Sequence, residues 1–299
     1  MSGHDHHHAH SHGQRHYWLG CGITLSFAAA EAATGWIANS LALLGDAGHL
    51  ATDGVALALA GIAAQVATRA ASHRHSYGLG RIEVMAALVN TLLMLAIVAG
   101  IALEAVWRFR HPPAVDGRLV LWVGVAGIAV NLIIYKVLQQ GKSSLNVRAS
   151  LLHVLGDILG SAAALTAGLV IWLTGWLPID PLLSLFIAAL ILASSLRLLR
   201  DAGQVLLEGV PAGLDLAEIG RNMAGIEGVK SVHDLHVWNV SSGEVALSAH
   251  VLIEDMARWE PVYQGLKARL HDAYGIGHIT LQPEPVVLAR IPVSHISYR

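Results

Sequence analysis

The sequence has little charge. Only 13% of its 299 residues are charged, whereas 54% are hydrophobic, and a soluble domain carries about 25% charged residues. This composition excludes an ordinary water-soluble protein and predicts a polytopic membrane protein. The formal net charge of -2 provides no basic surface for nucleic acid, so no nucleic-acid partner is expected.

The sequence also lacks the residues of several familiar sites. Its one cysteine, Cys21, excludes an intramolecular disulfide and a cysteine-cluster metal site. No glycine-rich phosphate loop ending in Gly-Lys-Ser/Thr is present, so ATP-driven pumping is not expected. No His-Glu-x-x-His helix is present either, and this argues against a metalloenzyme. The polar N-terminus does not resemble a secretory signal.

Histidine is abundant instead. There are 18 histidines, nearly as many as the 19 lysines and arginines together. Seven of them fall within residues 1–16, a polar low-complexity stretch that we predict to be a disordered, metal-chelating tail. Metal sites without cysteine depend on histidine and carboxylate ligands, so the composition favours a metal-handling protein.

Six apolar segments follow, each close to the roughly 20 residues that cross a bilayer. They are Trp18–Ala38, Leu41–Ala67, Val84–Trp107, Leu119–Leu138, Leu151–Leu173 and Leu182–Leu199. We therefore predict a membrane domain of six transmembrane helices over residues 17–204. Lysines and arginines concentrate on one side of this arrangement, which places both termini in the cytoplasm. The arginines between Arg108 and Arg118 fit this orientation poorly.

The segment 205–299 has a different, mixed pattern. Amphipathic helices are predicted at Leu214–Ile226 and Pro261–Tyr274, and strands at Val229–Val240, Glu244–Ile253 and Ile279–Glu284. The order α-β-β-α-β predicts a small ferredoxin-like α+β domain in the cytoplasm.

Two His-x-x-x-Asp pairs lie inside predicted membrane helices, His49/Asp53 and His153/Asp157. Residues i and i+4 share one helix face, so each pair points in one direction. If the two helices pack together, two imidazoles and two carboxylates form the tetrahedral ligand set that Zn²⁺ favours. The competing interpretation is a pair of structural hydrogen bonds between helices. Ionisable groups are costly in a membrane, and two identical pairs favour a functional site.

Asp46 lies one turn before His49 on a similar face. We expect it either to cap the helix at the membrane interface or to attract cations toward the site.

These features resemble the cation diffusion facilitator family over nearly the whole chain. The resemblance depends on LLGDAGHLATD, HSYGLGRIE, LHVLGDILGS, VHDLHVW and HITLQPE, in that order. It implies a homodimer in the bacterial inner membrane that exports metal by proton antiport. It also implies that His49, Asp53, His153 and Asp157 form the transport site, in the version that resembles zinc-selective members.

The resemblance further implies a metal site in the cytoplasmic domain, where Zn²⁺ is a regulatory as well as a transported ion. In this resemblance His233, His250 and Glu284 are the residues best placed for it. Strand periodicity puts His233 and His236 on opposite faces unless a bulge intervenes, and it separates His278 from Glu284. For His236, His271 and His278 we expect surface or hydrogen-bonding roles.

Some family members bind a second metal in the loop between the second and third helices. Here His75 matches one ligand position, but Ser72 and Leu79 occupy two others. His73 is a possible substitute, and a complete site is not expected. Arg81 and Glu83 are expected to serve helix packing or dimer contacts.

The predicted function is zinc efflux in exchange for protons. Cadmium or cobalt are possible further substrates. One rival is a transporter whose physiological metal is Cd²⁺, Co²⁺, Ni²⁺ or Fe²⁺. Another is a membrane metal sensor, which binds ions without moving them.

Overall fold

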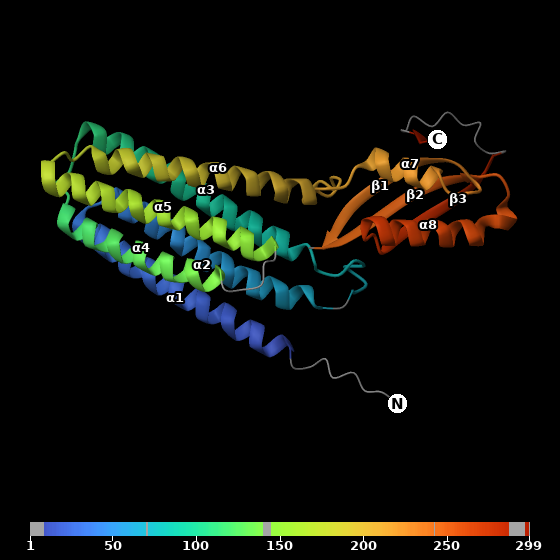
Figure 1. Cartoon of the computed structure of the whole chain (residues 1–299), viewed down its shortest axis with the longest axis horizontal. Coiled ribbons are helices and arrows are strands. Elements are labelled where there is room, and N and C mark those ends of the chain that lie inside the picture. The colour runs from blue at the N-terminus through green and yellow to red at the C-terminus, as the bar shows by residue number, and fades with distance from the viewer. Residues whose placement is uncertain (1–8, 70, 140–144, 242, 287–296, 299) are drawn as a thin grey trace. The chain divides into compact units, whose positions relative to one another are not determined.

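The computed structural model describes residues 9–69, 71–139, 145–241, 243–286 and 297–298, and contact clustering divides it into two units. The first unit contains most of six long helices (Figure 1). They are α1 (Ala9–Ala38), α2 (Leu41–Ala67), α3 (Ile82–Arg110), α4 (Gly117–Gln139), α5 (Leu145–Thr174) and α6 (Ile179–Leu206). These bounds confirm the six predicted apolar helices.

Five of the described helices, α2 to α6, are long and apolar enough to cross a membrane. The remaining helix, α1, combines the apolar segment Trp18–Ala38 with a polar beginning. The chain therefore has five to six candidate spans. Helix α1 begins at Ala9, so the prediction of a disordered tail is wrong for residues 9–16, which extend the apolar helix without a proline to interrupt it. Residues 1–8 of that tail lie outside the described residues.

Small residues bring α4 and α5 into close contact. A Cβ atom on Gly124 of α4 would lie 2.6 Å from the backbone nitrogen of Leu165 on α5. Gly117 and Gly168 face backbone atoms of the opposite helix in the same way. This is the close approach that small residues permit between membrane helices, and it fixes α5, which carries half of the candidate site.

The N-terminus of α2 is anchored by a buried carboxylate. Asp180, at the start of α6 and fully buried, accepts hydrogen bonds from the Ser40 hydroxyl at 2.6 Å and from the Leu41 and Ala42 backbone N–H groups at 2.7 and 3.3 Å. Such a carboxylate satisfies N–H groups that the first helical turn leaves without partners. Asp180 thus fixes the beginning of the helix that carries His49.

Arg108, which fitted the predicted orientation poorly, is only 7% exposed. It donates to the Asn39 carbonyl at 2.7 Å and to Glu104 at 2.9 Å, and its Nη1 lies 3.9 Å from Asp180. A buried, neutralised arginine does not act as a free positive charge in a loop. Its position therefore does not oppose the orientation that the remaining basic residues predict.

The second unit comprises residues 63–85 and 200–299. Its helices are α7 (Leu216–Ala224) and α8 (Trp259–Tyr274), and its strands are β1 (Val229–Ser241), β2 (Glu244–Ile253), β3 (His278–Pro285) and β4 (Ser297–Tyr298), with a short 3₁₀ turn η1 at Met256–Arg258. The predicted α-β-β-α-β order is confirmed. The sheet order is β3-β2-β1-β4, so β4 is an edge strand that the sequence did not indicate.

Both helices of this unit contribute to one apolar core with the sheet. Ile219 of α7 and Leu266 of α8 are fully buried with Val232, Leu247 and Val251 of the strands. Within the same unit, Arg81 lies 3.1 Å from Glu208 and donates to the Asn239 carbonyl at 3.3 Å. Arg81 therefore joins the segment between α2 and α3 to the C-terminal domain, as a packing residue.

Candidate metal centres

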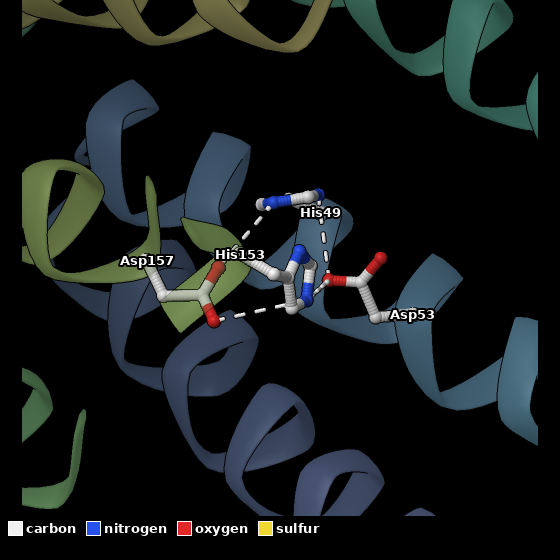
Figure 2. A group of neighbouring side chains, drawn as sticks. All are labelled: His49, Asp53, His153 and Asp157. Carbon is white, nitrogen blue, oxygen red and sulfur yellow. Dashed lines mark ion pairs between the residues drawn. The ribbon is translucent and has the colours of Figure 1, made fainter. Parts of the chain in front are cut away.

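Four side chains from two helices converge in the first unit, and we call them the His–Asp group: His49, Asp53, His153 and Asp157 (Figure 2). His49 and Asp53 lie one turn apart on α2, with His49 Nδ1 3.6 Å from Asp53 Oδ2. His153 and Asp157 repeat this arrangement on α5, with Nε2 3.8 Å from Oδ2. The i, i+4 spacing therefore places each pair as predicted.

The two pairs also contact each other across the helix interface. His49 Nε2 lies 3.5 Å from Asp157 Oδ1, and His153 Nε2 lies 3.3 Å from Asp53 Oδ2. The two imidazole rings meet edge to face, with centroids 5.8 Å apart. Figure 2 shows each aspartate reaching a histidine of the opposite helix. The prediction that α2 and α5 bring the four residues together is confirmed.

The electrostatic setting of the His–Asp group suits a cation. His49 and Asp157 are largely buried, while the His153 side chain is 51% exposed. Three buried atoms of the group, His49 Nδ1, Asp53 Oδ2 and Asp157 Oδ1, have no hydrogen-bond partner among the residues that the structure describes. Buried polar atoms ordinarily find a partner, so these atoms are available as ligands.

Two further acids lie nearby in the membrane unit. Glu31 on α1 is 1% exposed and Asp46 on α2 is 2% exposed. Asp46 Oδ1 lies against α5, because a Cβ atom on Gly160 would come within 2.6 Å of it, and the close packing of Gly35 on α1 against Leu43 on α2 brings Glu31 to the same region. The interpretation of Asp46 as an interfacial cap is wrong, because Ser40 and Asp180 perform that role. Glu31 was missed, although a glutamate inside an apolar segment is itself a signal.

A second group, which we call the C-terminal cluster, consists of His233, His250 and Glu284. His233 and His250 are directly paired across β1 and β2, and Glu284 lies on the neighbouring β3. His233 Nε2 is 3.2 Å from Glu284 Oε2, and His250 Nδ1 is 2.8 Å from Glu284 Oε1. Three adjacent strands thus present two imidazoles and one carboxylate on the same face.

A bulge in β1 changes the predicted sides of the strand. The register shifts by one residue between His233 and His236, where Asp234 has a left-handed φ of 51°. As a result His233 and His236 share a face, contrary to strict alternation. Asp234 lies 3.1 Å from His236 and 3.7 Å from His250, so it borders the C-terminal cluster.

The other histidines considered from sequence lie elsewhere. The His278 ring meets the Tyr77 ring edge to face with centroids 5.6 Å apart, and His271 lies 3.1 Å from Asp272. His75 is exposed and pairs with Ser72 in a backbone bridge. Within the described residues it joins no group of potential metal ligands.

The fold defines a multi-pass membrane protein, and the His–Asp group between two of its helices is consistent with a metal site. Comparison with known proteins agrees. Residues 18–207 match the cation efflux transmembrane domain, and residues 211–286 match the cytoplasmic domain of cation efflux proteins. The chain therefore belongs to the cation diffusion facilitator family. It is a cation efflux transporter with a cytoplasmic C-terminal domain, and not an enzyme.

Characterised relatives resemble the chain over most of its length. Zinc transporter ZitB of Escherichia coli is 40% identical over 94% of this chain and 92% of its own length. The cadmium, cobalt and zinc/H⁺-K⁺ antiporter of Bacillus velezensis is 36% identical with the same coverage. A metal-bound C-terminal domain of the CzcD transporter from Cupriavidus metallidurans is 41% identical over 24% of this chain and 99% of that domain, with a TM-score of 0.22.

Proposed function

We propose that the protein exports Zn²⁺ from the cytoplasm in exchange for protons, and that the His–Asp group is the transport site. The observation that carries this proposal is the spacing of the four side chains. Ligands about 2.0–2.1 Å from a tetrahedral zinc ion lie about 3.4 Å from one another. The contacts between the two helices measure 3.5 and 3.3 Å, so little movement would close the group around an ion.

The donor set supports zinc over the harder divalent ions. Two imidazole nitrogens and two carboxylate oxygens suit Zn²⁺, and less selectively Cd²⁺ or Co²⁺. Mg²⁺ and Ca²⁺ favour six or more oxygen ligands. Relatives named for zinc, or for cadmium, cobalt and zinc together, agree with this choice. Ni²⁺ and Fe²⁺ remain rival substrates, and the proteoliposome assay below, run with each of these ions in place of Zn²⁺, separates them.

Proton exchange follows from the chemistry of the ligands. Histidine and aspartate bind metal only in their deprotonated forms, so protons and metal compete for the same atoms. Histidine exchanges protons near physiological pH. Protons entering from outside therefore displace the ion, and the site returns protonated to the cytoplasm. A relative named as a proton antiporter supports this exchange.

The C-terminal cluster is proposed to bind a regulatory Zn²⁺. His233, His250 and Glu284 offer three ligand atoms within 4.8 Å of one another, and a fourth position remains for water or another group. The protein is proposed to act as a homodimer in the cytoplasmic membrane, with both termini in the cytoplasm.

Zinc flux into proteoliposomes tests the transport site. Asp157→Ala should reduce flux by more than about 100-fold, since even an outer partner of a metal ligand contributes 10–100-fold. Asp116→Ala, which removes an exposed carboxylate at the start of α4, should transport like the wild type. Normal flux through folded Asp157→Ala protein would refute the assignment. Zinc binding without flux in the wild type would instead indicate a sensor.

A further inference from the structure

The buried acids Glu31 and Asp46 have no part in the proposed metal site, yet they lie inside the membrane unit. Both are at least 98% buried. Neither oxygen of the Glu31 carboxyl group has a hydrogen-bond partner among the donors of the described residues. Helices α1 and α2 pack closely on either side of the two acids, because a Cβ atom on Gly35 would lie 3.0 Å from Leu43 and one on Gly54 would lie 2.5 Å from Leu25. This packing places Glu31 opposite the turn of α2 that carries Asp46. Glu31 is therefore a buried carboxyl group directed at a second one.

Two ionised carboxylates cannot hydrogen-bond to each other, because an ionised carboxylate only accepts. Contact between Glu31 and Asp46 becomes a hydrogen bond when a proton lies between them. Burial and a neighbouring like charge both oppose ionisation of the second group. In the described part of the chain, no lysine or arginine forms an ion pair with either acid. The pair thus has the chemistry of a proton-binding site.

The groups around the pair connect it to the metal site. Asp46 Oδ1 lies against α5 at Gly160, about one turn after Asp157. The charges of His49 and Asp157 act on Asp46, and the charge of Asp157 acts on Glu31. Asp46 precedes His49 by three residues, so their Cβ atoms are about 5–6 Å apart. An ion with two positive charges in the His–Asp group would favour a second negative charge on the acid pair.

We propose that Glu31 and Asp46 form a proton-binding site separate from the metal ligands, which holds one proton between the two carboxyl groups and releases it when Zn²⁺ binds. The O–H bond breaks and the proton passes to water, so the pair changes from one negative charge to two. When the metal leaves, the pair takes a proton from water and the charge returns. The inference rests on the proposed transport site, because the charge of the bound metal drives the release.

Isothermal titration of the full-length protein with Zn²⁺, in buffers of different ionisation enthalpy, measures the protons released per metal. Glu31→Gln keeps the size and a hydrogen-bond donor toward Asp46 but removes the exchangeable proton. It should release about one proton fewer than the wild type, and its plot of log affinity against pH should be shallower by about one unit. Protons from the tail and the C-terminal cluster cancel in the difference, because both proteins keep them.

Asp201→Asn is the matched control, since Asp201 is exposed on α6, and it should match the wild type. If Glu31→Gln fails to fold, Asp46→Asn tests the same proton and should give the same loss. An unchanged proton count would overturn the proposal. A uniform loss of affinity with an unchanged pH slope would also overturn it, because it would show a positioning role.

Two further arms separate other outcomes. When potassium replaces choline as the cation of the buffer, the number of protons released per zinc should not change. If it changes in the wild type but not in Glu31→Gln, the pair binds potassium and the proton proposal is wrong. Asp157→Ala should abolish zinc binding at the transport site. If that variant binds zinc like the wild type, the transport-site assignment fails, whatever Glu31→Gln shows.

Discussion

Asp180 provides a strong test of how the membrane unit is held together. Asp180→Ala removes the acceptor of the Leu41 and Ala42 backbone N–H groups, both in the buried first turn of α2. A buried donor left without a partner costs about 1–3 kcal/mol, so the two together cost about 2–6 kcal/mol. The Ser40 hydroxyl can rotate to another acceptor, and Arg108 still donates to Glu104 and to the Asn39 carbonyl. Neither group therefore adds the full cost of a buried donor without a partner.

Thermal unfolding of the purified protein in detergent measures this effect. The midpoint for Asp180→Ala should fall on the order of 10 °C, at about 2–4 °C per kcal/mol for a domain of this size. Asp116→Ala is the matched control, because Asp116 accepts from the Arg118 and Leu119 N–H groups at 3.1 and 3.2 Å but is exposed. Loss of such a cap costs about 0.5–2 kcal/mol.

Asp180→Asn should fall between these variants, since it retains one acceptor oxygen but loses the charge that faces Arg108 at 3.9 Å. The reasoning would be refuted if Asp180→Ala were no less stable than Asp116→Ala. That result would mean that water or a rearranged turn satisfies the first turn of α2.

Three other predictions concern packing, the C-terminal cluster and a surface ion pair. Gly124→Ala should lower the free energy of unfolding by about 1–3 kcal/mol through overpacking, and with it the midpoint of thermal unfolding. Gly100→Ala, with nothing within 4 Å of its new Cβ, should not lower the midpoint, and equal midpoints for the two variants would contradict the α4–α5 contact. His250→Ala should remove one bound zinc per protomer in equilibrium dialysis, while His271→Ala should remove none; no loss with His250→Ala would rule out the C-terminal cluster as a metal site. Arg258, 2.9 Å from Glu227, lowers the pKa of that exposed carboxyl below its ordinary 4.5. The ion pair therefore contributes to folding stability above pH 4.5, and this contribution is lost as the pH falls through the lowered pKa. The midpoint difference between wild type and Glu227→Gln should therefore shrink in acid, and a difference that grows in acid would contradict the assignment.

The helices and the His–Asp group were predictable because their signals are local. Apolar length alone located α2 at Leu41–Ala67, and the i, i+4 spacing put His49 and Asp53 on one face. The meeting of α2 with α5 needed one further assumption, that costly intramembrane ligands serve a common ion. The 3.5 Å and 3.3 Å contacts between the pairs show that the two helices do meet; the common ion stays a prediction.

Features that depend on distant partners were not predictable in this way. Whether Asp46 caps a helix or faces another acid depends on Glu31, which lies on a different helix. The strand β4 has only two residues and exists because it pairs with Val232 and His233 of β1. The bulge in β1 depends on the backbone at Asp234, a residue type that enters left-handed conformations more readily than most.

The bulge makes the C-terminal cluster sensitive to the length of β1 as well as to its composition. Because β1 has one extra residue between His233 and His236, its two halves on either side of Asp234 pair with β2 in two different registers. Deleting a single residue there would give both halves one register, so the side chains of one half would move to the opposite face of the sheet. Either the apolar core would lose Val237 and its neighbours, or His233 would leave Glu284. Insertions and deletions in this strand would therefore affect metal binding and folding together, whereas substitutions can affect them one at a time.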